Sequence, residues 1–176
     1  AFYLALGKSY FGRSYKVAVI DLDSQGNTSK ALGKYSCGID THKLFDPSKE
    51  WDNVIPTQTE ENPIALFPAS RNLINIDPID LKITGPAFKK SIMAINAAGY
   101  ELCIIDSPPA LGNRMRAGIL SSDFILGPIK VDQFSIDGIQ HLMETVKLAR
   151  QINRKVQFLG MVANMVDRRD REQIKN

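Results

Sequence analysis

Five short apolar runs, each the length of a β-strand, constrain the fold of this chain more than any other feature. They lie at residues 16–22, 64–67, 102–105, 124–126 and 156–162. Continuous apolar runs of this length are typical of strands that are buried on both faces of a parallel sheet.

Helical segments are expected between these runs. One is predicted over residues 86–98, with Pro86 in its first turn, and another follows Ser135, a plausible N-cap, with apolar residues at helical spacing. Strands that alternate with helices predict an α/β fold with a doubly wound, mostly parallel sheet flanked by helices.

The length of 176 residues fits one domain, so we expect a single domain over residues 1–176. The sequence opens at Ala1 in what reads as the middle of a helix, and it stops inside what reads as the start of another. We therefore expect a piece of a longer protein, truncated at both ends. Residues 38–62 are polar and rich in turn formers, which predicts a surface excursion.

Composition excludes several classes of protein. A hydrophobic content of 44% and a charged content of 23% are ordinary for a globular domain, and the net charge of +3 permits an anionic partner without requiring one. Cys37 and Cys103 are far apart, and neither histidine has neighbours at ligand spacing, which argues against a disulfide framework and a zinc site. The same cysteine usage makes a reducing cytoplasm the expected location. No apolar run reaches membrane-spanning length, and we expect no membrane partner.

Two of the apolar runs end in aspartate. Asp21 and Asp23 follow the first run, and Asp106 follows the run at 102–105. Ligands of doubly wound sheets bind outside the carboxyl ends of the strands, and an apolar strand that ends in Asp is typical of the Walker B carboxylate, which holds the Mg²⁺ of a bound nucleotide. The alternative is that these aspartates only end a strand and begin a turn.

Four segments resemble motifs of one family, the ParA/MinD ATPases. DLDSQGN resembles the DxDPQGN motif of its ParA/Soj branch, and IIDSPPALG resembles its IID[TS]PPSLG motif. GPIKVDQFSIDGIQHLMETVKLAR and NMVDRRDR resemble two later segments of the same branch. The order and approximate spacing of the four match along essentially the whole chain.

This resemblance implies a P-loop NTPase-like fold of the deviant Walker A class. It also implies a protein that binds ATP with Mg²⁺ in a sandwich homodimer and hydrolyses it slowly. The ATP-bound dimer would bind DNA non-specifically and, through a centromere-binding ParB-like partner, move a plasmid or chromosome. The implied location is the cytoplasm, in association with the nucleoid.

The family's site residues carry over to matching positions here. Asp23 matches the catalytic aspartate that positions the attacking water, Asp21 supports catalysis and the magnesium shell, and Asp106 matches the Walker B metal ligand. Asn164 and Asp167 fall where the family's adenine-contacting loop lies.

A cluster of arginines, Arg168, Arg169 and Arg171, falls near the family's DNA-contacting surface. A solvated face that binds nothing is the alternative for such a cluster. Arg114 and Arg116 stand where the family has apolar or small residues, and we expect them to face solvent rather than a dimer interface, because long charged side chains rarely bury without partners.

One motif of the family is missing from the sequence, the phosphate-binding KGGxGKT loop. Gly7-Lys8-Ser9 does not replace it, because no strand precedes it and Phe2 stands where the first glycine is needed. The resemblance places the true loop immediately upstream of Ala1, and the alternative is that this protein has lost it.

Two other functions compete with a partition ATPase. A non-catalytic ParA-like module would keep the fold but not hydrolyse ATP. A MinD-like regulator of division placement would cycle on the membrane through a C-terminal amphipathic helix, which this chain does not reach. DLDSQGN and the DRR segment favour the partition branch.

Overall fold

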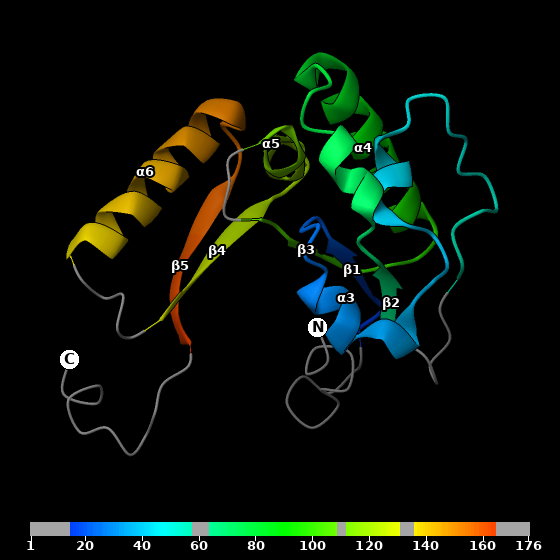
Figure 1. The fold of residues 1–176 in the computed structure, drawn as a ribbon, viewed down its shortest axis with the longest axis horizontal. Coiled ribbons are helices and arrows are strands. Elements are labelled where there is room, and N and C mark those ends of the chain that lie inside the picture. The colour runs from blue at the N-terminus through cyan, green and yellow to red at the C-terminus, as the bar shows by residue number, and fades with distance from the viewer. Residues whose placement is uncertain (1–14, 58–63, 109–111, 131–135, 165–176) are drawn as a thin grey trace. The chain divides into compact units, whose positions relative to one another are not determined.

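A computed structural model describes residues 15–57, 64–108, 112–130 and 136–164. The chain forms two compact units, residues 1–121 and residues 122–176 (Figure 1). A single domain over residues 1–176 stays a prediction. Within the described ranges, no helix has the length and apolar character needed to cross a membrane.

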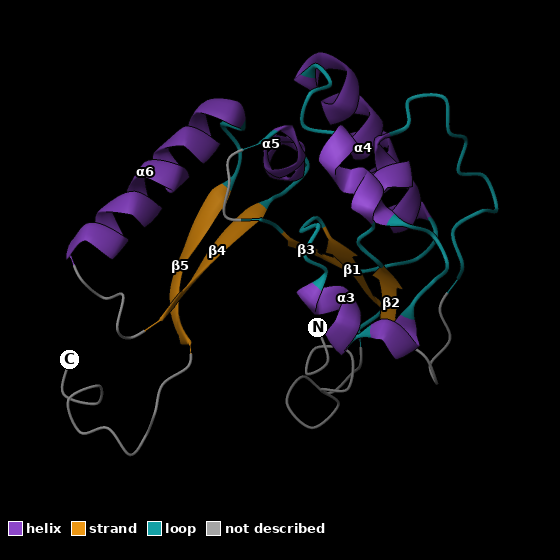
Figure 2. Cartoon of the chain, viewed as in Figure 1, coloured by secondary structure: helices purple, strands orange, loops and turns teal. Residues whose placement is uncertain are grey.

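The first unit is built on a three-stranded parallel sheet (Figure 2). Its strands are β1 (Val17–Asp21), β2 (Ile64–Phe67) and β3 (Leu102–Asp106), in the order β2-β1-β3. Val17 is level with Ile64 on one side and with Leu102 on the other. The parallel α/β fold expected from the apolar runs is confirmed, and the predicted strand positions hold to within a residue at each end.

Strands β1 and β2 are buried on both faces, which explains why these two strands are apolar without alternation, whereas β3 is only partly buried. Successive residues of a strand point to opposite faces, so β1 contributes to two apolar clusters. One cluster packs Ala18 and Ile20 with Phe88 and Ile95 of α4 (Leu81–Ala97). The other packs the opposite face with partly buried residues around α3 (Asn27–Ala31) and the 3₁₀ turn η1 (Gly33–Tyr35), namely Leu32 and Tyr35.

Helix α4 begins earlier than predicted, at Leu81 rather than residue 86. The side chain of Asp80 accepts a hydrogen bond from the backbone N–H of Lys82 at 2.8 Å, which satisfies one of the free donors at the helix start. Pro86 therefore lies inside the helix, on its exposed side. The prediction was wrong because a proline in the first turn is common, and the Asp80 cap one turn earlier overrides that preference.

The excursion at residues 38–62 also differs from its prediction, because part of it packs into the core. The 3₁₀ segment η2 (Thr41–Phe45) places the Phe45 ring 4.6 Å from that of Phe88. The Thr41 hydroxyl donates to the carbonyl of Phe67 at 2.7 Å, and Trp51 is only 5% exposed. A few buried side chains hold this segment against α4 and β2. Their spacing is irregular and the segment is polar overall, so its sequence does not reveal them.

The second unit pairs β4 (Phe124–Lys130) with β5 (Gln157–Asn164) in parallel. The strands are connected through α6 (Ile136–Ile152), which begins where the sequence predicts, although Ser135 itself lies outside the described residues. Helix and strand pack closely at Gly127, where a Cβ would stand 2.8 Å from a methyl of Leu142. Strand β4 runs past the predicted end at residue 126, since a proline removes only one donor from an edge strand.

Candidate active site

Strands β1 and β3 bring the predicted carboxylates to one edge of the sheet. Asp21 is level with Asp106 in the parallel register, and the backbone N–H of Leu22 donates to the carbonyl of Asp106 at 2.8 Å. Asp23 follows two residues beyond Asp21 at the same edge. Asp106 is exposed and Asp23 is half-buried, so both carboxylates are open to a ligand, whereas Asp21 has no exposed surface.

Asp21 is fully buried at this edge and holds its neighbours through hydrogen bonds. Its Oδ2 accepts hydrogen bonds from the backbone N–H of Ser29 at 2.8 Å and from the Ser29 hydroxyl at 2.6 Å. Its Oδ1 accepts from the backbone N–H of Asp23 at 3.1 Å. The Ser29 hydroxyl also accepts from the N–H of Ala69, just after β2. With its oxygens turned to these donors, Asp21 is placed to support the site rather than to bind a metal directly.

The turn after β1 fixes Asp23. Its Oδ1 accepts from the N–H of Gln25 at 2.9 Å, and its carbonyl accepts from the N–H of Gly26 at 2.9 Å. Gly26 has a φ of +64°, a left-handed conformation that glycine adopts without steric cost. The chain can therefore reverse at once into α3 while the carboxylate of Asp23 stays at the sheet edge.

Helix α3 reaches Asp106 through a residue that the sequence did not single out. The Thr28 hydroxyl donates to Oδ2 of Asp106 at 2.7 Å. The first turn of α3 thus orients the carboxylate at the end of β3, just as Ser29 of the same helix holds Asp21.

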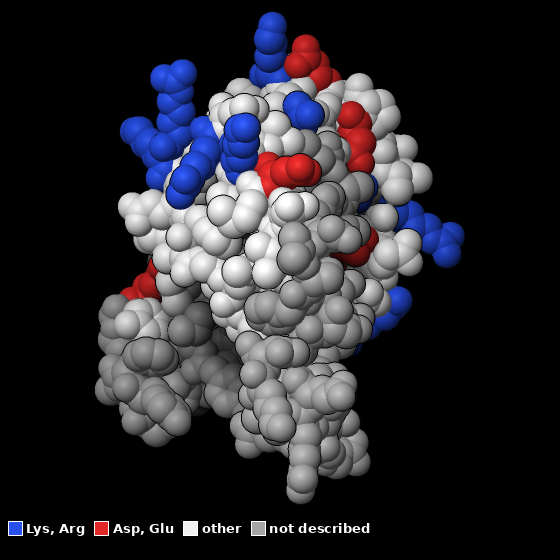
Figure 3. Space-filling view, turned by 90° about the vertical axis from the view of Figure 1, so that its left-hand side faces the viewer, with Lys and Arg blue, Asp and Glu red and all other residues white. Residues whose placement is uncertain are grey.

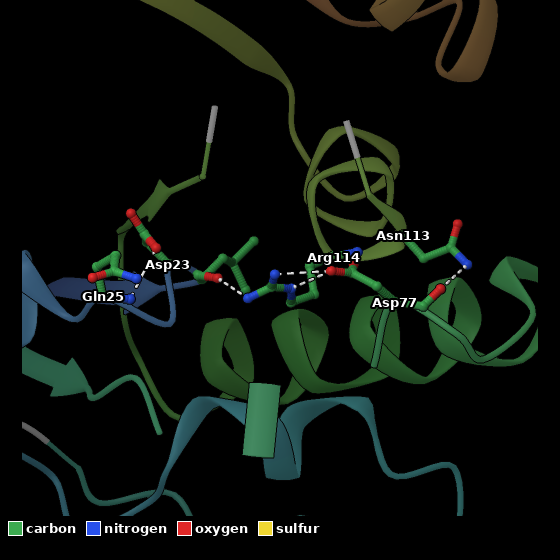
Figure 4. A network of polar contacts seen from close by, with 6 residues as sticks. Asp23, Gln25, Asp77, Asn113 and Arg114 are labelled. Atoms are coloured by element: carbon green, nitrogen blue, oxygen red, sulfur yellow. Dashed lines mark hydrogen bonds and ion pairs between the residues drawn. The ribbon is translucent and has the colours of Figure 1, made fainter. Parts of the chain in front are cut away.

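Arg114 does not face solvent as predicted. It lies in α5 (Asn113–Leu120), is 8% exposed, and donates from Nη1 to the carbonyl of Leu22 at 3.1 Å (Figure 4). Its Nε and Nη2 contact Oδ2 of Asp77 at 3.0 and 2.8 Å. The buried charge is tolerated because Asp77 pairs with it. Arg116, two residues further along, is half-buried.

The ion pair changes the acidity of Asp77. Partial burial acts to raise the pKa of this carboxyl, but the hydrogen bonds and positive charge of Arg114 outweigh it and hold the pKa below its ordinary value. Asp77 is therefore charged at neutral pH. No sequence signal pointed to it, because its partner is 37 residues away.

The structure does not place the other predicted site residues relative to this edge, so their roles stay predictions. Asn164 is the last residue of β5, in the second unit. Asp167 and the arginines Arg168, Arg169 and Arg171 lie outside the described residues, as does the Gly7-Lys8-Ser9 segment.

The carboxylate oxygens at this edge suit a magnesium ion. In the part of the chain that the structure describes, no three His, Cys, Asp or Glu side chains gather as a metal cluster. Asp106 supplies carboxylate oxygens, and Mg²⁺ commonly takes one or two carboxylates together with water and the oxygens of a bound phosphate. The residues present fit a magnesium ion that arrives with a phosphate-bearing ligand.

A parallel α/β sheet with carboxylates at the ends of adjacent strands is typical of the class of proteins that bind a ligand at the carboxyl edge of the sheet. A family profile described as an AAA domain matches residues 3–158. Protein IncC of Escherichia coli is 36% identical over 169 residues, which are 94% of this chain and 46% of IncC. The chromosome partitioning protein ParA of Caulobacter vibrioides is 28% identical over 172 residues, 94% of this chain and 64% of that protein.

Solved structures agree on the fold. Cobyrinic acid a,c-diamide synthase from Mycobacterium smegmatis, solved with bound ADP and magnesium, superposes with a TM-score of 0.76 at 22% identity, covering 98% of this chain and 69% of that one. The chain belongs to the AAA-domain family and, within it, to the ParA/MinD ATPases. It spans about half the length of the IncC relatives that it matches, 46% and 48%.

Proposed function

We propose that the native-length protein is a ParA-type ATPase of plasmid or chromosome partitioning. The observation that carries the proposal is the placement of Asp23 and Asp106 at the open ends of two paired parallel strands. The family and the partition proteins among its relatives support it. In this proposal the protein binds ATP with Mg²⁺ and hydrolyses it slowly.

Each carboxylate has its own proposed role. Asp23 orients the water that attacks the γ-phosphate, and Asp106 holds the magnesium ion. The ion, when bound, neutralises charge on the phosphate oxygens. Asp21 acts through its bonds to Ser29 and Asp23, so it supports the magnesium shell without touching the ion. Phosphoryl transfer depends mainly on positioning and charge stabilisation, so two well-placed carboxylates can matter more than any nucleophile.

The remaining parts of the proposal concern partners. Asn164 and Asp167 contact the adenine, and ATP brings two copies of the protein together as a homodimer. A ParB-like centromere-binding protein is the partner that connects the protein to the plasmid or chromosome. The protein works in the cytoplasm on the nucleoid, with no membrane partner.

Non-specific DNA binding is proposed for the ATP-bound dimer. Arg168, Arg169 and Arg171 are one candidate group of cations. The described residues add a second, because the end of α6 and the turn after it expose four basic side chains, Lys147, Arg150, Arg154 and Lys155. Figure 3 draws a face on which Lys and Arg side chains gather at one end. Clustered cations bind the phosphate backbone whatever its sequence.

The test of this function is ATP hydrolysis by the native-length protein, with Mg²⁺ or with EDTA and with or without duplex DNA. The proposal predicts slow turnover that requires magnesium. It also predicts DNA binding with ATP but not with ADP, and a binding constant that falls as salt rises. A protein that binds ATP without turning it over is the non-catalytic ParA-like module instead. ATP-dependent binding to lipid vesicles in place of DNA would support a MinD-like regulator.

A further inference from the structure

We infer that Arg114 is a positioning residue for Asp23, an inference that rests on the function proposed above. The peptide group between Leu22 and Asp23 is held at both ends. Its carbonyl accepts from Nη1 of Arg114 at 3.1 Å, and its N–H donates to Oδ1 of Asp21 at 3.1 Å. With the plane of this peptide fixed, the position of the Asp23 Cα is fixed as well.

The guanidinium of Arg114 is itself held in place by Asp77. Oδ2 of Asp77 contacts Nε and Nη2 of Arg114. Oδ1 accepts a hydrogen bond from the backbone N–H of Arg114 at 3.0 Å. Close approach is possible because position 112 is glycine, where a Cβ would stand 2.5 Å from Oδ1 of Asp77. The carboxylate thus caps the start of α5 and aims the side chain of Arg114 at Leu22.

The geometry requires arginine. A guanidinium is planar and carries five donors in a fixed fork, so it can bind a carboxylate on one side and a carbonyl on another. Lysine would offer one rotating ammonium for both partners. The burial of Arg114 also strengthens its bonds, because little water competes for them.

The side chain of Leu22 is packed against the same helix. A Cβ at Gly118 of α5 would stand 3.2 Å from a methyl of Leu22. Helix α5 therefore contacts the residue before Asp23 through both its carbonyl and its side chain. Loss of Arg114 would remove the hydrogen bond to the Leu22 carbonyl and leave the apolar contact of the Leu22 side chain. The turn after β1 would then stay against α5, but the orientation of its peptide group would no longer be fixed.

This role predicts a specific kinetic signature in the native-length protein. Arg114→Ala should lower kcat for ATP hydrolysis by about 10- to 100-fold, since small displacements of a positioned group cost that much. KM and the Kd for ATP should stay within about threefold, because Asp23 acts on water rather than on ATP binding. Added guanidinium should restore part of kcat, and Arg114→Lys should be impaired as well.

Two control variants separate positioning from general loosening. Asn113→Ala removes the bonds of Asn113 to the carbonyls of Asp77 and Ile79, at 2.9 and 2.7 Å, and so loosens the same helix start without touching Leu22. Arg116→Ala removes an arginine from the same helix, two residues away. Both controls should keep kcat within about threefold of wild type.

Each result has a defined meaning. An unchanged kcat in Arg114→Ala, or an equal fall in Asn113→Ala, overturns the positioning role while leaving the ATPase in place. If Arg114→Ala fails to fold, the Arg114→Lys variant decides by the same comparison of kcat with KM. A wild-type protein that hydrolyses no ATP overturns the proposed function and this inference together.

Discussion

Ser29 makes two hydrogen bonds to the buried carboxylate of Asp21, one from its backbone N–H and one from its hydroxyl. The same hydroxyl accepts from the N–H of Ala69 at 2.7 Å. One small side chain thus connects the end of β1, helix α3 and the segment after β2. The edge of the sheet that carries the carboxylates depends on this connection.

Ser29→Ala should therefore destabilise the protein. The change leaves Oδ2 of Asp21 with one donor fewer in a buried place, and it takes the acceptor from the N–H of Ala69. Unsatisfied buried groups cost about 1–3 kcal/mol each, so the free energy of unfolding should fall by about 1–3 kcal/mol in a urea titration.

The matched control for this change is Ser24→Ala in the turn before α3. Ser24 is half-buried, and no hydrogen bond joins its hydroxyl to another of the described residues. Its loss should change the unfolding free energy by under about 0.5 kcal/mol. Equal stabilities of the two variants would show that the Ser29 hydroxyl does not hold the site.

Gly112→Ala should disturb the start of α5. The new methyl would stand 2.5 Å from Oδ1 of Asp77, so the carboxylate must move away from Arg114. Overpacking of this kind costs about 1–3 kcal/mol, which thermal or urea unfolding would show. Gly33→Ala is the control, because nothing lies within 4 Å of a Cβ at that position. If both variants were as stable as the wild type, the close contact between position 112 and Asp77 would be refuted.

The Asp77–Arg114 pair should make stability depend on acid pH. The pKa of Asp77 is lower in the folded state than its ordinary value of 3.8, so the folded state favours the charged carboxylate. This contribution is complete above pH of about 4 and is lost as pH falls through the folded pKa. Urea unfolding at a series of pH values from 7 to 2.5 would measure it.

Asp77→Asn isolates this pair from the other carboxylates. The variant should be less stable than wild type at pH 7, and it should lose less stability than wild type between pH 4 and 2.5, so the two curves converge. Parallel curves over that interval would mean that Asp77 does not titrate with a lowered pKa.

The sequence was sufficient to predict the parallel α/β fold, because strands buried on both faces must be apolar without alternation. It was also sufficient to predict Asp23 and Asp106 at one edge, since the carboxyl ends of parallel strands share an edge. The start of α4 was missed because a cap at Asp80 competed with Pro86, and the sequence offers no means to weigh the two.

The partners of the site were beyond prediction for a physical reason. Arg114 reads as a surface residue unless its counter-charge is known, and Asp77 reaches it only through the packing of α4 and α5. Trp51 lies inside the segment that was expected to form a surface excursion, although it packs in the core. Contacts between residues far apart in the chain leave no local pattern.

The most direct test of the account is Asp23→Asn in the native-length protein, with ATP binding and ATP turnover measured on the same sample. The amide is isosteric and can still accept from the N–H of Gln25, so the turn should keep its shape. Asp52→Asn, at an exposed position in the excursion, is the control. We expect Asp23→Asn to bind ATP as the wild type does and to lose about 100-fold or more in kcat, while Asp52→Asn keeps the wild-type kcat. Turnover at the wild-type rate in Asp23→Asn would contradict the central claim.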